Sequence, residues 1–323
     1  MSILSKAHFH DEAAAFKKLE ELLWPNGPVC PHCEGKERIY TLDGVRSKAS
    51  KKNPEGVVRH GLKKCGHCRK QFTVRVGTVF ESSHVPLHKW FQAAHLLCAS
   101  KKGISAHQLH RILEISYEAA WFMGHRLREA MRTGGLAPIG GHGKPVEIDE
   151  TFIGKKEGVV KHPNARGYAH KQTVFSIIER GGEVRTFHLD KANTANIKPI
   201  VDANIRKESA LMTDEAKYYE PIGAEFKYHL TVNHSAGEYV RGGIHTNTLE
   251  GYFSIFKRGM KGVYQHCSEK HLHRYLAEFD FRYNNRIAVG VHDEARSEKA
   301  LLGVKGKRLT YRRANQVISF CSP

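Results

Sequence analysis

Apolar residues recur at helical spacing in two parts of the first half of the chain. The first part, 11–24, predicts a short amphipathic helix. The second part, 86–131, predicts a longer helical region with a break at 114–116, so that a helix over 106–113 is followed by another over 117–131. Two helices across a tight turn are typical of a helix-turn-helix, although an ordinary helical hairpin has the same pattern.

The pattern changes beyond a glycine-rich linker at 134–143. Strands are predicted at 145–153, 171–179, 183–189 and 210–213, with a hairpin turn at Arg180-Gly181-Gly182 between the second and the third. Helices are predicted from Asn193 or Thr194 to 206 and over 247–283, the latter with a break near 264–268. The two halves of the chain therefore differ in their secondary structure, and the linker marks a domain boundary.

Two Cys-x-x-Cys knuckles, Cys30-Pro31-His32-Cys33 and Cys65-Gly66-His67-Cys68, lie in a segment with short predicted strands at 38–42 and 71–76. Each knuckle presents two thiolates to one ion, and two knuckles complete a tetrahedral site that suits structural Zn²⁺. A redox pair would leave one of the knuckles unexplained. The sequence therefore predicts a zinc ribbon with the ligands Cys30, Cys33, Cys65 and Cys68. Of the other cysteines, Cys98 is expected in the core, and Cys267 and Cys321 have no evident partner.

Basic residues exceed acidic ones in this chain of 323 residues, 51 Lys+Arg against 33 Asp+Glu, which gives a formal net charge of +18. Such an excess favours a polyanionic partner, most often nucleic acid. The segment 31–75 alone holds 12 basic and 4 acidic residues, so we expect the zinc ribbon to contact phosphates. Because no apolar run approaches the roughly 20 residues of a membrane helix and no signal peptide is evident, we expect a cytoplasmic protein with no membrane partner.

Acidic residues interrupt the apolar pattern of the predicted strand 145–153. Strand alternation places Glu147 and Asp149 on one face and Glu150 on the other. A carboxylate inside a strand of apolar residues is unfavourable unless something compensates its charge, and a metal cation would do so. Glu147 and Glu150 adjoin Asp149 but have no independent signal of their own.

Two further acids stand at the ends of predicted elements. Asp214 directly follows the strand 210–213, and Glu250 lies early in the helix that begins at 247, with 35 residues between the two acids. Mg²⁺ prefers carboxylate oxygens, and two such ions about 3.5–4 Å apart stabilise both oxygens of a phosphodiester cleavage. Asp149, Asp214 and Glu250 are therefore candidate ligands of Mg²⁺ or Mn²⁺, with salt bridges to the abundant Lys and Arg as the alternative interpretation.

Basic residues follow Glu250 along the same predicted helix. Lys257 lies seven residues, or two turns, after Glu250 and so on roughly the same face, with Arg258 and Lys261 nearby. We expect them to bind DNA, with Lys257 holding a phosphate next to the metal ions; a solvated basic face is the alternative. Among the histidines, His245 is the best placed to approach the site.

The acids Asp149, Asp214 and Glu250, with this interval, resemble the triad of DDE transposases and retroviral-type integrases. The chain resembles more closely a bacterial insertion-sequence family with an N-terminal zinc ribbon and a DDE domain. The motifs that carry this resemblance extend over nearly the whole chain: Cys30-Pro31-x-Cys33, Glu147-Ile148-Asp149-Glu150-Thr151-Phe152-Ile153-Gly154, Thr213-Asp214, His245-Thr246-Asn247-Thr248-x-Glu250-Gly251, Phe256-Lys257-Arg258-Gly259-x-Lys261-Gly262 and Phe281-Arg282-Tyr283-Asn284-Asn285-Arg286.

The resemblance implies an α/β fold with a mixed sheet: an RNase H-like catalytic domain, whose first three strands run antiparallel, preceded by a zinc ribbon and a helix-turn-helix-like segment. The domains it implies are an N-terminal helix at 1–29, the zinc ribbon at 30–80, a helical DNA-binding segment at 81–133, the catalytic domain at 144–290 and a C-terminal tail at 291–323.

The activity that the resemblance implies is DNA transposition. Such an enzyme binds the terminal inverted repeats of its element as a homo-oligomer, cleaves DNA with bound metal ions and joins the ends to target double-stranded DNA. In this family an asparagine can replace the third acid, so Asn247, three residues before Glu250, is an alternative ligand. Two other functions stay open: a zinc-dependent DNA-binding regulator with a vestigial site, and an RNase H-like nuclease or resolvase. A bacterial, nucleoid-associated location would follow.

Overall fold

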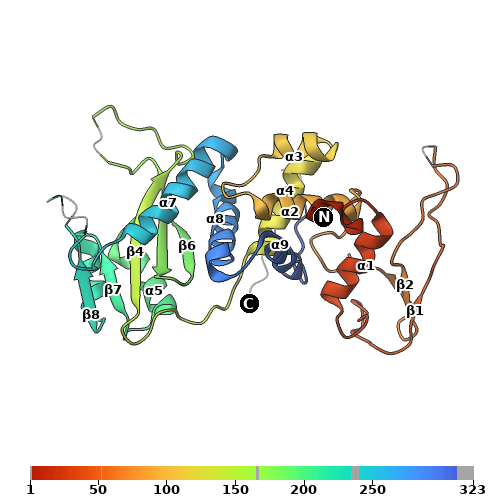
Figure 1. Cartoon of the computed structure of the whole chain (residues 1–323). Helices are drawn as coiled ribbons and strands as arrows, with labels where there is room; N and C mark the ends of the chain where they lie inside the picture. Colours follow the sequence, from red (N-terminus) through yellow and green to blue (C-terminus); the bar gives the residue numbers. More distant parts are fainter. Residues whose placement is uncertain (1, 52, 165–166, 234–236, 238–239, 311–323) are drawn as a thin grey trace. The chain divides into compact units, whose positions relative to one another are not determined.

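The computed structural model describes residues 2–51, 53–164, 167–233, 237 and 240–310 (Figure 1). Its contacts divide the chain into two compact units. The first combines Met1–His95, Ala106–Ala130 and the segment from Ser297, and the second combines Leu96–Ser105 and Met131–Arg296. The domain boundaries expected from the sequence stay predictions. None of the helices in the described part of the chain is long and apolar enough to span a membrane.

The first unit begins with two short 3-10 turns, Ile3–Ser5 and Ala7–Phe9, and with helix α1 (Glu12–Leu23). Asp11 caps α1, because its side chain accepts a 2.7 Å hydrogen bond from the Ala14 amide. The apolar stripe of α1 is buried, which confirms the helix predicted over 11–24.

The zinc-ribbon segment forms a small antiparallel sheet in the order β1-β2-β3, with β1 (Ile39–Thr41), β2 (Lys63–Cys65) and β3 (Gln71–Phe72). The strand predicted at 71–76 is too long, since the chain turns after Phe72 and the Val76 amide donates to the Thr73 carbonyl. The sequence also missed β2, because its basic residues hide the strand pattern.

The helical region consists of α2 (Leu87–Ala99), α3 (Ala106–Leu113) and α4 (Tyr117–Met131), which confirms the predicted elements. Ser116 starts α4, since its hydroxyl accepts a 3.2 Å hydrogen bond from the Ala119 amide. Glu114 turns the chain with a left-handed φ of +50°. Cys98, on α2, is buried as expected.

The second unit is built on a five-stranded mixed sheet in the order β6-β5-β4-β7-β8. Its strands are β4 (Pro145–Ile153), β5 (Gln172–Glu179), β6 (Val184–Leu189), β7 (Ala210–Thr213) and β8 (Tyr228–Thr231). The first three strands pair antiparallel, while β7 pairs parallel with both β4 and β8. The mixed sheet implied by the resemblance is therefore confirmed, although the sequence pattern missed β8.

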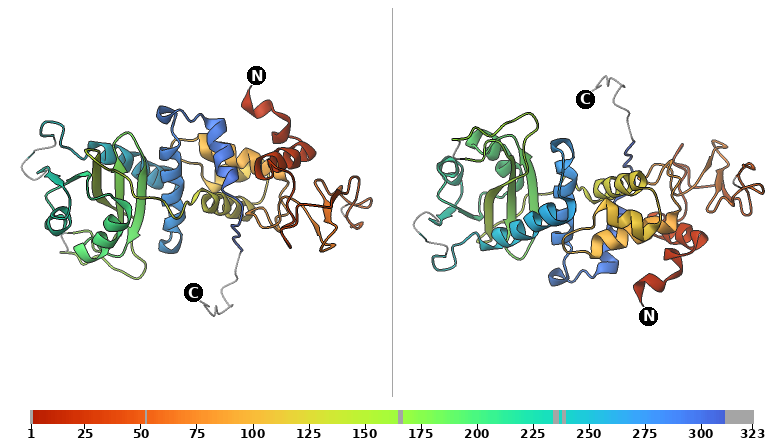
Figure 2. Two further views of the ribbon diagram at one scale, coloured as in Figure 1. Left: turned by 90° about the horizontal axis from the view of Figure 1, so that it is seen from below. Right: turned by 90° about the horizontal axis from the view of Figure 1, so that it is seen from above.

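Helices cover both faces of this sheet (Figures 1 and 2). Apolar residues of α7 (Asn247–Gly259) and α8 (Glu269–Asn284) form one core with Ile153, Val174 and Val184. On the other face, α5 (Thr194–Asn204) and the short α6 (Glu220–Gly223) form a second core with Val146 and Ile148. Alternate residues of β4 thus face different cores, as strand geometry requires.

Two differences from the expected elements lie near the C-terminus. A π-helical turn, Met260–Tyr264, continues α7, and the chain then breaks before α8 begins, close to the predicted break. The segment 291–323, expected to be a C-terminal tail, contains helix α9 (Asp293–Leu302), whose Ala300 and Leu301 are buried. Only a few apolar residues mark this helix in the sequence. Cys321 lies outside the described residues.

A buried polar cluster joins α8 to β6 and α7. The carboxyl group of Asp280 accepts hydrogen bonds from the Thr186 amide (2.8 Å), the Thr186 hydroxyl (2.6 Å) and the Tyr252 hydroxyl (2.6 Å). Asp280 keeps some exposed surface, but these donors enclose its carboxyl group. Burial raises the pKa of Asp280 to about 6, although the hydrogen bonds from Thr186 and Tyr252 act in the opposite direction and lower this pKa.

We expect the Asp280→Asn variant to remove a pH dependence of stability. Because the folded-state pKa of Asp280 is raised to about 6, the stability that this group contributes is present at low pH and is lost as the pH rises through that value. The free energy of unfolding of the natural chain, relative to the variant, should fall by about 2 kcal/mol between pH 4 and pH 7. Urea unfolding across this range measures the difference, and a constant difference contradicts the expectation.

Candidate metal centres

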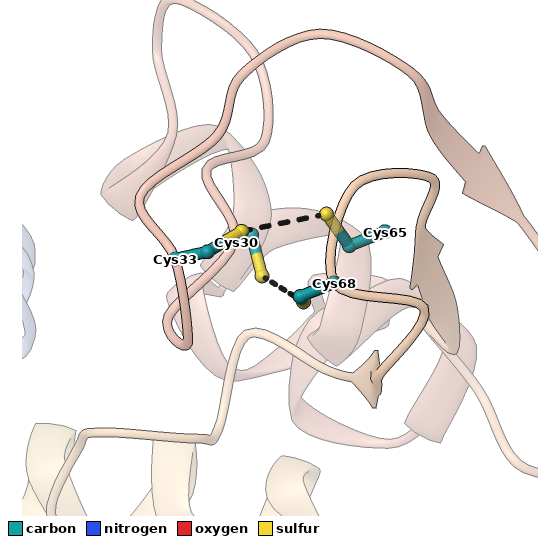
Figure 3. Close-up of side chains that lie close together, drawn as sticks. All are labelled: Cys30, Cys33, Cys65 and Cys68. Atoms are coloured by element: carbon teal, nitrogen blue, oxygen red, sulfur yellow. Dashed lines mark hydrogen bonds between the residues drawn. The ribbon is translucent and has the colours of Figure 1, made fainter.

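The four cysteines of the two knuckles meet at one point in the first unit, as Figure 3 shows. The Sγ atoms of Cys30 and Cys68 lie 3.6 Å apart, as do those of Cys33 and Cys65, and all four lie within 4.8 Å of one another. A tetrahedral zinc ion with Zn–S bonds of about 2.3 Å places its sulfur ligands about 3.8 Å apart. The four thiols therefore fit structural Zn²⁺, as predicted.

The two knuckles share one backbone design. The Cys30 amide donates to the carbonyl of Gly35, and the Cys65 amide donates to that of Lys70, five residues on in both cases. The residue after each second cysteine, Glu34 or Arg69, has a left-handed φ, of +57° or +58°. Each turn thus aims both of its thiols at the same point.

The knuckle backbone also favours the thiolate form that binds metal. Hydrogen bonds from the backbone of Cys68 and His67 lower the pKa of Cys65 to about 6. A backbone hydrogen bond from Gly35 also lowers the pKa of Cys33, but burial and the three other thiols outweigh it and raise this pKa to about 12, so the four thiols share their protons unequally until a cation binds. His32 and His67 are outside the group of candidate ligands that the described residues form, which contains only the four cysteines. The expectation that four cysteines suffice therefore agrees with the structure.

The sheet of the second unit brings Asp149 and Asp214 to the same place. In the parallel ladder between β4 and β7, Glu147 pairs with Met212. Continuing this register by two residues sets Asp149 beside Asp214, which directly follows the end of β7. Residues that pair across neighbouring parallel strands share a face, and here it is the face covered by α7.

Glu250 approaches the two aspartates from the first turn of α7. Burial raises the pKa of Asp149 well above its usual range, and the negative charges of Glu150, Asp214 and Glu250 raise this pKa further. Asp214 and Glu250 therefore both lie within electrostatic range of Asp149. Glu250 and the alternative ligand Asn247 are both exposed in the first turn of this helix.

The surroundings of Asp149 fit a divalent cation. Its carboxylate has one short hydrogen bond, 2.7 Å from the Glu150 amide, and its acidic neighbours repel it. A bound cation would remove this repulsion, and oxygen donors are those that Mg²⁺ and Mn²⁺ accept. The acids do not form a closed cage, because among the described residues only the four cysteines have ligand atoms all within 4.8 Å of one another.

Lys257 lies close to these acids, as its position on α7 predicted. Burial lowers the pKa of Lys257, the charges of Lys261 and Lys171 add to this effect, and those of Asp149 and Glu250 oppose it. Lys171, at the start of β5, was missed by the sequence analysis, because it lies 86 positions before Lys257 in the chain. Arg258 and Lys261 are exposed on the same helical segment.

The other two carboxylates of β4 have partners within the protein. Glu147 is fully buried and receives hydrogen bonds from Arg180, Thr248 and Leu249. On the opposite face, the hydroxyls of Tyr218 and Tyr219 donate to Glu150, the latter over 2.6 Å. The sequence analysis missed these partners.

His245, which was expected to approach the acids, contacts Arg180 and Glu147. Its ring nitrogen Nδ1 lies 2.9 Å from the Arg180 guanidinium and 3.4 Å from Glu147. The structure therefore places His245 beside Arg180 and Glu147.

Comparisons with known proteins match a family model to part of each unit. Residues 140–284 match the model of an ISXO2-like transposase domain, and residues 10–71 match that of a transposase zinc-ribbon domain. An uncharacterized protein in transposable element ISH50 of Halobacterium salinarum is 28% identical over 294 residues, which covers 85% of this chain and 91% of that protein. A crystal structure of a pre-cleavage Mos1 transpososome gives a TM-score of 0.26 at 13% identity, over 65% of this chain and 74% of that chain, too low to establish a shared fold.

We expect the chain to hold about one Zn²⁺ and to lose it in the Cys30→Ser and Cys65→Ser variants, because three thiolates leave the tetrahedral site incomplete. Elemental analysis of the purified chain measures the zinc content. The Cys267→Ser variant is the matched control, since Cys267 lies in the other unit, and it should keep its zinc. Full zinc content in both knuckle variants would rule out the four-cysteine site.

Proposed function

Since the chain belongs to the transposase family in which a zinc-ribbon domain is combined with an ISXO2-like transposase domain, we propose that it cuts and rejoins DNA at the ends of its own element. This proposal rests on the cluster of Asp149, Asp214 and Glu250, the last of which lies in the first turn of α7. Water would cleave a phosphodiester at each end and leave a 3′-hydroxyl, which would then attack a phosphodiester of target DNA and release a new 3′-hydroxyl.

The three acids would hold the metal ions that this chemistry needs. Two Mg²⁺ or Mn²⁺ ions, when bound, would supply positive charge to both the attacking and the leaving oxygen. The ladder of β4 and β7 would fix the positions of Asp149 and Asp214, and the first turn of α7 would fix that of Glu250. Asn247 is the alternative third ligand. The same residues would serve cleavage and strand transfer, because both reactions replace one oxygen on phosphorus by another.

Lys257 would hold a DNA phosphate beside the metal ions, with Arg258 and Lys261 continuing the contact along the helix. Burial is the main cause of the lowered pKa of Lys257; the charge of Asp149 opposes this effect, and those of Lys261 and Lys171 add to it. Lys261 and Lys171 therefore lie within electrostatic range of Lys257, and a polyanionic strand would be attracted to these three lysines.

The zinc ribbon and the α3–α4 pair would bind the terminal inverted repeats. The basic segment 31–75 surrounds the zinc ligands and supports this role. Two element ends must be processed together, so we expect a homo-oligomer to act. A regulator with a vestigial site, or a nuclease or resolvase acting on branched DNA or hybrids, would differ in its activity on linear element ends.

We expect the Asp149→Asn, Asp214→Asn and Glu250→Gln variants to lose cleavage of linear DNA that carries the element ends, by at least a factor of about 100 in Mg²⁺ or Mn²⁺. Each substitution removes one negative charge that would hold a metal ion. A gel assay on the DNA that flanks the gene measures cleavage. Asp190→Asn is the matched control, because Asp190 is exposed at the end of β6, and it should stay active.

The outcomes of this assay separate the alternatives. Full cleavage by the Asp149 and Asp214 variants would contradict the proposal. Loss of cleavage in Asn247→Ala but not in Glu250→Gln would make Asn247 the third ligand. A natural chain that binds the ends but cuts no DNA would indicate the regulator, and a preference for junctions or hybrids would indicate the nuclease or resolvase.

We expect the Lys257→Gln variant to bind element-end DNA more weakly and to reduce the slope of log K against log salt concentration by about 1, since one phosphate contact is lost. Fluorescence anisotropy over a range of salt concentrations gives this slope. Lys191→Gln is the control, because Lys191 is exposed before α5, on the opposite face of the sheet. An unchanged slope for Lys257→Gln would exclude the phosphate contact.

A further inference from the structure

Glu147 carries a negative charge into the centre of the second unit, where its side chain has no exposed surface. Its Oε1 atom accepts hydrogen bonds from Arg180 Nε (2.5 Å) and from the Thr248 hydroxyl (2.8 Å), and its Oε2 atom accepts one from the Leu249 amide (2.9 Å). Both oxygens are therefore occupied by donors of the protein, which excludes Glu147 as a metal ligand in this arrangement.

Thr248 and Leu249 belong to the first turn of α7, where backbone amides have no partner within the helix. Thr246, the N-cap residue, does not cap α7 with its side chain. The carboxylate of Glu147, which lies on the neighbouring strand β4, caps the helix instead. Its charge also interacts favourably with the positive end of the helix dipole. The start of α7 is thereby attached to the middle of β4.

Arg180 completes this attachment from the turn between β5 and β6. Besides Glu147, its guanidinium donates to the carbonyls of Gly243 (2.8 Å) and His245 (2.7 Å), in the segment that leads into α7. It also lies 2.9 Å from His245 Nδ1. The partly exposed guanidinium of Arg180 thus neutralises Glu147 and fixes the path of the chain before the helix begins.

Both ends of this attachment, Glu147 on β4 and Leu249 on α7, lie next to a proposed catalytic acid. Glu147 and Asp149 point to the same face of β4, two residues and roughly 6.6 Å apart. Leu249, which donates to Glu147, directly precedes Glu250. We infer that Glu147 is a positioning residue, which together with Arg180 and Thr248 sets where Glu250 stands relative to Asp149 and Asp214. This inference rests on the proposed function of those acids.

The hydroxyl of Thr248 offers the cleanest test, because its removal leaves no buried charge behind. The Thr248→Val variant deletes one hydrogen bond to Glu147, while Thr248→Ser retains it. Glu147→Gln is the stronger change, since a glutamine amide group would face one of the donors of Arg180, Thr248 or Leu249. Thr194→Val is the matched control: Thr194 lies in the first turn of α5, and its hydroxyl donates to the Tyr218 carbonyl (3.0 Å) on the opposite face.

Three biophysical measurements and the kinetics of end cleavage, all on the full chain, distinguish positioning from a general loss of structure. Hydrogen exchange without metal reports protection of the Leu249 amide, titration with Mn²⁺ gives its affinity, and thermal unfolding gives stability. We expect Thr248→Val and Glu147→Gln to lose amide protection and to bind Mn²⁺ about 10- to 100-fold more weakly. Their kcat for end cleavage should fall while the KM for DNA stays constant. Thr248→Ser should restore all of these values, and Thr194→Val should change only stability.

The outcomes separate this inference from the proposed function. If the natural chain binds Mn²⁺ and cleaves DNA, while Thr248→Val and Glu147→Gln match it in Mn²⁺ affinity and kcat, the positioning role is wrong and the proposed function stands. Equal effects of Thr248→Val and Thr194→Val on stability alone would also overturn it. If the natural chain neither binds Mn²⁺ nor cleaves DNA, the proposed function fails, and the positioning role fails with it.

Discussion

The structure of the second unit depends on how three carboxylates of one central strand are compensated. Glu147, Asp149 and Glu150 lie within four residues of β4, and an ionised carboxylate without a partner is strongly unfavourable inside a protein. Glu147 accepts hydrogen bonds from the first turn of α7 and from the Arg180 guanidinium, and Glu150 accepts hydrogen bonds from two tyrosine hydroxyls. Asp149 faces other acids instead, so its environment is the one that calls for an external cation.

The same requirement shapes the architecture around the strand. The compensation of Glu147 fixes α7 to β4 and thereby brings Glu250 to the end of the β4–β7 ladder, where Asp149 and Asp214 meet. In the first unit, four cysteine thiols lie within 4.8 Å of one another, and a bound zinc ion would compensate the negative charge of their thiolates. Both units are thus organised by negative groups that need a positive partner.

Much of the fold was predictable from the sequence, because amphipathic helices such as α1 and α3 bury one stripe. The apolar residues of β5 are buried on both faces of the sheet. The short β8, the basic β2 and the helix α9 were missed, since few apolar residues mark them. Strand alternation correctly separated Asp149 from Glu150. It did not reveal why Glu147 is present, because the donors that compensate it, Arg180 and Leu249, lie 33 and 102 positions away and meet it only in the folded chain.

The most direct measurement is the anomalous scattering of Mn²⁺ soaked into crystals of the full chain. Manganese should bind between Asp149 and Asp214, with Glu250 on its third side, while Glu147 stays bonded to Leu249 and Arg180. Manganese bound to Glu147 or Glu150, or an Asp149 that remains without manganese at saturating concentration, would contradict the central claim that Asp149 is the carboxylate of β4 whose charge a metal ion compensates.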